Sequence, residues 1–169
     1  TGHGVPGAFM SMIGIDQLNH IIIEKNITTP SEILNQLNQE IKIALKQTAD
    51  AKAKDGMDLA LCVMDEQKMM LEFAGAHRPL YFIRNGELKE FKADKMAIGG
   101  FTADDFVFTN HKINLQKGDT IYIFTDGFID QFGGKDGKKF MSKTFKNLLL
   151  SIQNQKMLEQ ENILFQAVN

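Results

Sequence analysis

Apolar residues recur at helical spacing near both ends of the chain, which predicts helices there. Pro6 suits a first helical position, and Phe9 and Met12 begin an apolar stripe that is predicted to face the core. A second helix is predicted to start at Thr29, because the segment from Thr29 to Glu32 has the sequence of a capping box. The four predicted helices cover residues 6–25, 29–45, 140–152 and 158–168.

The middle of the chain changes to patterns typical of β-strands. The run from Met57 to Met64 is mostly apolar, as in a buried strand, and Asn85-Gly86 is a strong hairpin signal. Strands joined in sequence by tight turns pair antiparallel, so we expect an α+β fold with helices segregated from an antiparallel sheet. The predicted strands cover residues 57–64, 69–74, 79–84, 87–91, 106–115 and 120–125.

Length and composition narrow the class of protein. Since domains average about 150 residues, the 169 residues are predicted to form one domain, 1–169. A formal net charge of −2 argues against a nucleic-acid binder, whose affinity comes from a broad basic face. The one cysteine, Cys62, excludes an internal disulfide and fits the reducing cytoplasm. No apolar run approaches the roughly 20 residues of a membrane helix, so no direct membrane contact is expected.

A glycine-rich turn, Gly2-His3-Gly4, stands just before the first predicted helix. Glycines let a backbone approach a ligand closely, and a helix start offers N–H groups and a positive dipole end to an anion. His3 is the candidate for acid catalysis or phosphate contact. The alternative is an ordinary turn without a ligand, because a single G-x-G is a weak signal. Since Thr1 is not Met and a turn is already in progress, we expect the chain to belong to a longer protein.

A carboxylate follows the last predicted strand, in the segment Thr125-Asp126-Gly127. An Asp at the end of an apolar strand can aim into a cleft, and its burial is costly unless it is hydrogen-bonded or metal-bound. The alternative is that Asp126 caps the next turn. An EF-hand is excluded, because Gln131 stands where that loop needs glycine.

Two further positions stay open between structural and functional roles. Asp58 interrupts the first predicted strand, and it either faces the surface or provides a carboxylate near a metal. Arg78 stands next to His77 in a tight strand connection, where it either lies in a solvated loop or binds phosphate through both of its nitrogens.

Three parts of the chain, taken together and in this order, resemble the metal-dependent protein phosphatase (PPM) family. Residues Thr1–Ser11 are similar to its second motif, segments between Gly56 and Tyr81 to its central hairpins, and Gly118–Gly127 to its late metal motif. The branch that the chain resembles is that of the stage II sporulation phosphatase E (SpoIIE) and the sigma-factor-regulating RsbU-type phosphatases. The likeness runs from Thr1 to Phe140.

The resemblance implies an α-β-β-α sandwich of two antiparallel sheets flanked by helices. It also implies two Mn²⁺ or Mg²⁺ ions, which lower the pKa of a bound water and neutralise phosphate oxygens during hydrolysis of phosphoserine or phosphothreonine. In such a site Asp126 is a metal ligand, Gly127 lets the backbone pass close by, and Asp58 is a further candidate ligand. The phosphate loop would consist of Gly2 and Gly4 with His3 between them.

The chain departs from the family pattern at both ends. The family's metal-bridging Asp would stand just before Thr1, and its final Asp pair would follow Asn169. We therefore expect the phosphatase domain 1–169 to lack its first strands and its last strand. The fragment alone is expected to be inactive and to bind Mn²⁺ weakly or not at all.

The implied function is that of a phosphatase in a bacterial signalling protein. Its substrate would be a phosphorylated regulatory protein such as an anti-sigma-factor antagonist, with sensor domains upstream in a cytoplasmic or membrane-tethered parent. Two alternatives stay open: a pseudophosphatase that binds a partner without catalysis, and a small-molecule anion sensor. The helices over 6–49 carry more apolar surface than one sheet face needs, which predicts a homodimer or a regulatory contact through residues such as Ile22 and Leu37.

Overall fold

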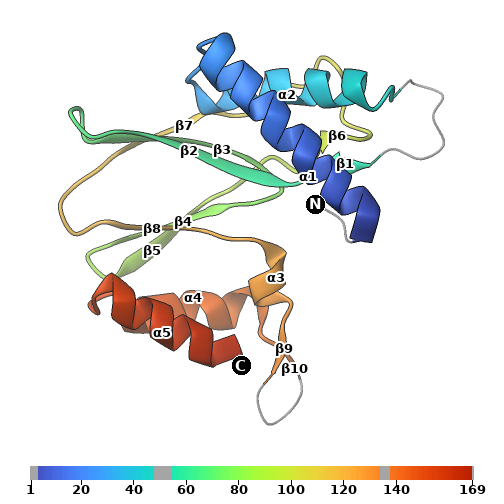
Figure 1. The fold of residues 1–169 in the computed structure, drawn as a ribbon. Coiled ribbons are helices and arrows are strands. Elements are labelled where there is room, and N and C mark those ends of the chain that lie inside the picture. The colour runs from blue at the N-terminus through green and yellow to red at the C-terminus, as the bar shows by residue number, and fades with distance from the viewer. Residues whose placement is uncertain (1–3, 48–54, 134–137, 169) are drawn as a thin grey trace. The chain divides into compact units, whose positions relative to one another are not determined.

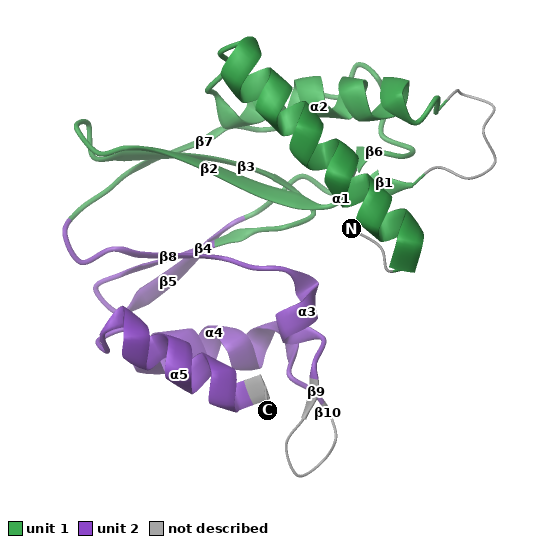
Figure 2. Cartoon of the chain, viewed as in Figure 1, with its two compact units in different colours: residues 1–80, 92–116 green, residues 81–91, 117–169 purple. Residues whose placement is uncertain are grey.

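The computed structural model describes residues 4–47, 55–133 and 138–168. These residues form helices and short strands in the order shown in Figure 1. The chain divides into two compact units, which Figure 2 colours separately. Unit 1 consists of residues 1–80 and 92–116, and unit 2 consists of residues 81–91 and 117–169.

The first predicted helix is present as α1 (Gly4–Asn19), which continues as five residues of π-helix, η1 (His20–Glu24). The side of α1 that was predicted to face the core faces outward. Phe9 is 59% exposed and Met12 is 67% exposed. The prediction is therefore wrong for Phe9 and Met12, whereas Ile21, further along the same predicted helix, is buried in the core.

Small residues make the packed side of α1 instead. Gly7, Met10 and Gly14 are its buried residues. At Gly14 a Cβ would lie 2.9 Å from the sulfur of Met57, so a larger residue would require the end of this flexible side chain to move. The core side of α1 is thus set by close backbone approach, which a search for large apolar residues does not detect.

The second predicted helix is present as α2 (Pro30–Ala44), with Thr29 at the N-cap position. The predicted start is confirmed, but the side chain of Thr29 makes no capping hydrogen bond, so the capping-box prediction is wrong. Its carbonyl accepts the N–H of Ile33 at 3.0 Å. The apolar residues of the buried face of α2 are Ile33, Leu34, Leu37 and Ile41.

The larger sheet of unit 1 is antiparallel and has the order β2-β3-β7. Its strands are β2 (Leu59–Asp65), β3 (Met70–Ala76) and β7 (His111–Asn114). Helices α1 and α2 lie over one face of this sheet (Figure 1). Ala74 and Ala76 of β3 share one apolar core with the buried face of α2. Small residues on the strand let the helix pack close to the sheet.

A second, short pairing in unit 1 joins β1 (Gly56–Met57) to β6 (Ile98–Gly99), with Gly56 opposite Gly99. The strand predicted over 57–64 is therefore divided at Asp58 into β1 and β2. The strand predicted over 106–115 is shorter than expected, because only β7 pairs with β3.

Unit 2 contains the sheet with the order β5-β4-β8. Its strands are β4 (Leu80–Arg84), β5 (Glu87–Phe91) and β8 (Thr120–Ile123). Between β4 and β5, Asn85 has φ 50° and Gly86 has φ 82°. Two consecutive positive φ angles are the geometry of a type I′ hairpin turn, so the Asn-Gly prediction is confirmed.

The remaining elements of unit 2 follow β8. They are α3 (Asp126–Ile129), β9 (Phe132–Gly133), β10 (Lys138–Lys139), α4 (Met141–Ile152) and α5 (Met157–Val168). The two predicted closing helices are thus present within a few residues of their expected bounds, whereas the four-residue α3 was not predicted.

The core of unit 2 is aromatic. Phe145 of α4 lies 6.0 Å from Tyr81, 4.9 Å from Phe124 and 4.7 Å from Phe128, measured between ring centroids. These separations are in the range in which aromatic pairs attract each other beyond simple burial. Because Phe124 and Phe128 stand on either side of Asp126 in the sequence, the aromatic core fixes the segment that carries this carboxylate.

The predicted α+β class, with antiparallel sheets and flanking helices, is confirmed. Compact units are not by themselves domains, so the single domain over 1–169 stays a prediction.

Candidate functional site

Asp126 is the first residue of α3, immediately after the N-cap residue Thr125. Its carbonyl accepts the N–H of Asp130 at 2.8 Å, which closes the single turn of this helix. A carboxylate in a first helical turn is favoured by the positive end of the peptide dipoles. The side chain is exposed, not buried as the apolar strand pattern suggested. Asp126 therefore lies where a cation in solution can reach its oxygens.

Gly127 follows as the second residue of α3 and is also exposed. A Cβ at this position would lie 3.3 Å from the Oγ1 of Thr125, a tight but not prohibitive contact. A glycine here leaves the surface beside Asp126 without a side chain.

Strand β8, which leads to Asp126, is held at its start by an ion pair. Asp119 accepts hydrogen bonds from Arg84 Nε at 2.8 Å and from Arg84 Nη2 at 2.7 Å. The Asp119 side chain is almost completely buried, and this bidentate bonding raises the pKa of the Arg84 guanidinium. Asp119, part of the segment that resembles the late metal motif, thus anchors β8 to β4.

A second anchor of β8 comes from α5. The hydroxyl of Tyr122 donates to Oε1 of Gln160, and Nε2 of Gln160 donates to the carbonyl of Gln155 at 3.0 Å. Gln160 is buried, so its amide would be costly to leave without partners. The two anchors together with the aromatic core place Asp126 at a fixed position in unit 2.

The glycine loop of the N-terminus is only partly described. Gly2 and His3 lie outside the described residues. Gly4 begins α1 with φ 68°, and no atom lies within 4 Å of the place where its Cβ would be. Gly4 belongs to unit 1 and Asp126 to unit 2, so the convergence of the loop with this carboxylate stays a prediction.

Asp58 and Arg78, which were considered separately in the sequence, form an ion pair in unit 1 between Asp58 Oδ2 and Arg78 Nη2. The Asp58 side chain is 25% exposed and that of Arg78 is 18% exposed. A metal ion at Asp58 would have to compete with this half-buried guanidinium. The pairing supports a structural role for both residues. No local signal in the sequence links them, since 20 positions separate them.

The described residues do not assemble a complete metal site. They contain no group of three or more His, Cys, Asp or Glu side chains close enough to hold one ion. The carboxylate oxygens of Asp126 are hard donors of the kind that Mg²⁺ and Mn²⁺ prefer, but they form only one element of a site.

Cys62, on β2, is not an activated nucleophile. Burial raises the pKa of its thiol to about 11, so the reactive thiolate is scarce near neutral pH.

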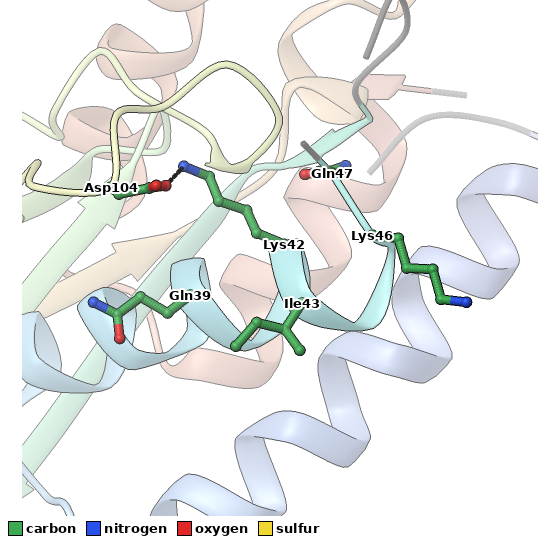
Figure 3. A pocket seen from close by; sticks show the side chains of 6 residues that line it. All are labelled: Gln39, Lys42, Ile43, Lys46, Gln47 and Asp104. Atoms are coloured by element: carbon green, nitrogen blue, oxygen red, sulfur yellow. Dashed lines mark hydrogen bonds and ion pairs between the residues drawn. The ribbon is translucent and has the colours of Figure 1, made fainter. Parts of the chain in front are cut away.

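An open pocket of about 450 Å³ lies in unit 1 beside the C-terminal end of α2. Figure 3 shows the Lys42 ammonium directed to Asp104, which it meets at 2.6 Å, while Lys46 extends in another direction. Gln47 also has partners, donating to the Asp55 carbonyl and accepting the N–H of Gly100. The polar groups of this pocket are therefore used mainly to hold the structure together.

The helices do not include a membrane-crossing segment: within the described parts of the chain, none is both long and apolar enough.

Residues 1–168 match the family described as Stage II sporulation protein E (SpoIIE). The SiaA-PP2C domain of Pseudomonas aeruginosa is 34% identical, with a TM-score of 0.85 over 99% of this chain and 64% of that chain. The PP2C phosphatase domain of SpoIIE from Bacillus subtilis, with a fragment of its regulatory domain, is 19% identical, with a TM-score of 0.69 over 99% of this chain and 46% of that chain. The comparison with curated proteins gives no significant match.

A structure of the RsbU and RsbW domains of a Mycobacterium tuberculosis protein is 21% identical, with a TM-score of 0.65 over 91% of this chain and 41% of that chain. This likeness and that to the Bacillus subtilis domain concern the fold alone. The chain spans less than two thirds of the length of each of these three structures.

Proposed function

Because the chain belongs to the SpoIIE family of PP2C-type phosphatase domains, we propose that it acts in a metal-dependent protein serine/threonine phosphatase. The observation that carries the proposal is the placement of Asp126. This carboxylate follows β8, lies at the surface, and is fixed by the aromatic core on both sides. A rigid, reachable oxygen donor is what a hard divalent cation requires.

The cofactor in this proposal is Mn²⁺ or Mg²⁺, with two ions in the complete site. The Mn-presoaked form of the Bacillus subtilis SpoIIE phosphatase domain is among the similar structures, which supports a divalent cation as cofactor. Asp126 is the ligand, with Gly127 beside it. Roles for His3, Gly2 and Gly4 in the phosphate loop, and for Asp58 as a further ligand, stay predictions.

The proposal is tested on the full natural protein that contains this chain. Asp126→Asn should lower Mn²⁺-dependent hydrolysis of a phosphoserine peptide by at least about a hundredfold, because it removes a charged ligand from the metal site. Asp130→Asn is the matched control, since Asp130 lies one turn further on and pairs with Lys139 at 3.2 Å. Equal activity of the Asp126→Asn protein and the wild type would refute the ligand role.

The substrate class proposed is a phosphorylated regulatory protein, such as an anti-sigma-factor antagonist. A similar solved structure contains both an RsbU and an RsbW domain, which supports the proposal that this chain acts on a regulatory protein. Sensor domains upstream and a cytoplasmic location, in a soluble or membrane-tethered parent, complete this proposal.

A partner-binding role is the second candidate, and the exposed side of α1 favours it. Val5, Phe9, Met12 and Ile15 are large apolar residues of α1 that are all more than half exposed. Four such residues on one helix are more than isolated surface positions usually provide. By contrast, Leu37, which the sequence suggested for a contact, is completely buried in the core of unit 1.

We propose that this side of α1 forms the homodimer or regulatory contact. Met12→Glu should then shift the purified chain toward monomer in sedimentation analysis, because it places a charge in an apolar contact. Ile43→Glu is the matched control, since Ile43 is an equally exposed apolar residue of α2. A wild-type chain that stays monomeric at millimolar concentration would refute the homodimer.

A further inference from the structure

A small pocket in unit 1 brings together a histidine and a lysine that the proposed function does not use. It has a volume of about 250 Å³ and lies beside the β1–β6 pairing. We refer to it as the β6 pocket. Its lining residues are Gly56, His77, Lys95, Met96, Ala97, Gly100, Phe101 and Thr102.

Backbone pairing brings together the two segments that carry His77 and Lys95. The segments on either side run parallel through a bridge between Ala76 and Asp94. The N–H of Asp94 donates to the Gly75 carbonyl at 3.0 Å, and the N–H of His77 donates to the Asp94 carbonyl at 2.9 Å. His77 and Lys95 directly follow the two bridged residues on their segments, and both line the β6 pocket.

His77 is held in an uncommon backbone conformation, with φ 58°. A residue other than glycine at positive φ carries strain that persists only where the surrounding structure holds it. The hydrogen bond from the His77 N–H to Asp94, and the one from the Asp94 N–H to Gly75, provide that hold, and His77 remains exposed. The structure shows no hydrogen bond or ion pair for the side chains of His77 and Lys95 within its described residues.

The β6 pocket has no carboxylate among its lining residues. Of the acidic side chains close by in the sequence, two are engaged elsewhere. Asp94 accepts the N–H of Thr109 at 2.7 Å and its hydroxyl at 3.0 Å, and Asp58 pairs with Arg78. The donors at the pocket are thus not neutralised by a lining acid, which favours an anion as ligand.

The walls of the β6 pocket are fixed before any ligand binds. Asn38 accepts the N–H of Gly99 at 2.8 Å, and Gln47 accepts the N–H of Gly100 at 2.9 Å. Within the loop, the Thr102 hydroxyl donates to the Ala97 carbonyl at 2.7 Å. A preformed wall lowers the cost of ordering a binding site.

We propose that the β6 pocket binds an oxyanion, either a phosphate or a carboxylate group, between His77 and Lys95. Phe101, which is 75% exposed, and Met96 offer an apolar edge for the part of the ligand that carries this group. The volume admits a small group of this kind and not a whole nucleotide. The proposal rests on unit 1 alone and does not depend on Asp126.

The test is an NMR titration of the ¹⁵N-labelled chain with inorganic phosphate and, separately, with acetate, both without metal. Saturable shifts of the backbone signals of residues 77, 95 and 100–102 are expected with at least one anion. A response to phosphate alone identifies a phosphate site, and a response to acetate alone identifies a carboxylate site. A response to both anions identifies a general oxyanion site. Absence of saturable shifts at these residues with both anions would overturn the proposal.

Variants decide whether His77 and Lys95 are the donors. Lys95→Gln should weaken binding by about fivefold or more, because a charge-assisted hydrogen bond is lost. His77→Asn should weaken it as well, and asparagine tolerates the positive φ, so the backbone is preserved. Lys46→Gln is the control of equal charge change, at the pocket beside the C-terminal end of α2. Equal loss in Lys46→Gln and Lys95→Gln would show a general charge effect and reject the site.

Discussion

Units 1 and 2 use their aspartates differently. In unit 1, Asp58 is half-buried and pairs with Arg78, so its charge is balanced within the fold. In unit 2, Asp126 starts a short helix at the surface, while the buried carboxylate Asp119 carries the structural ion pair with Arg84. A half-buried carboxylate needs a partner to offset the loss of hydration, whereas an exposed one keeps much of its hydration. Residue type alone therefore does not identify a metal ligand, because availability depends on burial and on the partner.

The cores of the two units also differ. That of unit 1 joins aliphatic residues of α2 to small residues of β3, and carboxamides such as Asn38 tie the helix to nearby loops. That of unit 2 is built around Phe145 and the rings that contact it. The aromatic core holds the segment with Asp126 from both sides. This contrast suggests variants that test whether Asp58 has a structural role and Asp126 a ligand role.

The largest effect is expected from the aromatic core. Phe145→Ala should lower the free energy of unfolding by about 3–5 kcal/mol, because it removes a buried ring and leaves a cavity. Phe165→Ala, on an exposed position of α5, should cost less than about 1 kcal/mol. Urea denaturation followed by circular dichroism measures both. Similar costs for the two variants would contradict the central place of Phe145.

A smaller difference in unfolding free energy should distinguish the two candidate aspartates, Asp58 and Asp126. Asp58→Ala should cost about 1–3 kcal/mol of unfolding free energy, because it leaves the half-buried Arg78 guanidinium without this carboxylate. Asp126→Ala should cost less than about 1 kcal/mol, the size of a favourable helix-end charge. If Asp126→Ala were the more destabilising of the two, the assignment of Asp58 to structure and Asp126 to ligand binding would be reversed.

The smallest effect concerns alkaline pH. Since burial raises the pKa of the Cys62 thiol to about 11, the folded state keeps its proton where the unfolded thiol has lost it. This contribution to stability is complete below the unfolded pKa and is lost as pH rises toward 11. Burial also raises the pKa of Tyr81 and Tyr122 in unit 2, so both units lose stability in alkali.

Comparison of Cys62→Ala with the wild type isolates the contribution of unit 1. Between neutral pH and pH 11, the variant should lose less of its unfolding free energy than the wild type, because it has no thiol to ionise. Thermal unfolding at a series of pH values measures this difference. An identical pH profile for the two proteins would show that the thiol is not protected by burial.

Several elements could be predicted because their signals are local. The Asn85-Gly86 turn and the closing helices depend on residues a few positions apart, and they are present as expected. The family resemblance likewise came from short segments in a fixed order, and the family match confirms it. The candidate site was harder, because the roles of Asp58 and Asp126 depend on partners far away in the chain.

The sequence by itself determined where helices and turns form, the α+β class and the family, since period and turn chemistry belong to neighbouring residues. Only the tertiary structure decided which side of α1 is buried, that Asp58 pairs with Arg78, and that His77 and Lys95 line one pocket. Those outcomes follow from which segments pack together. Burial and pairing energies arise between residues distant in sequence, so no local pattern contains them.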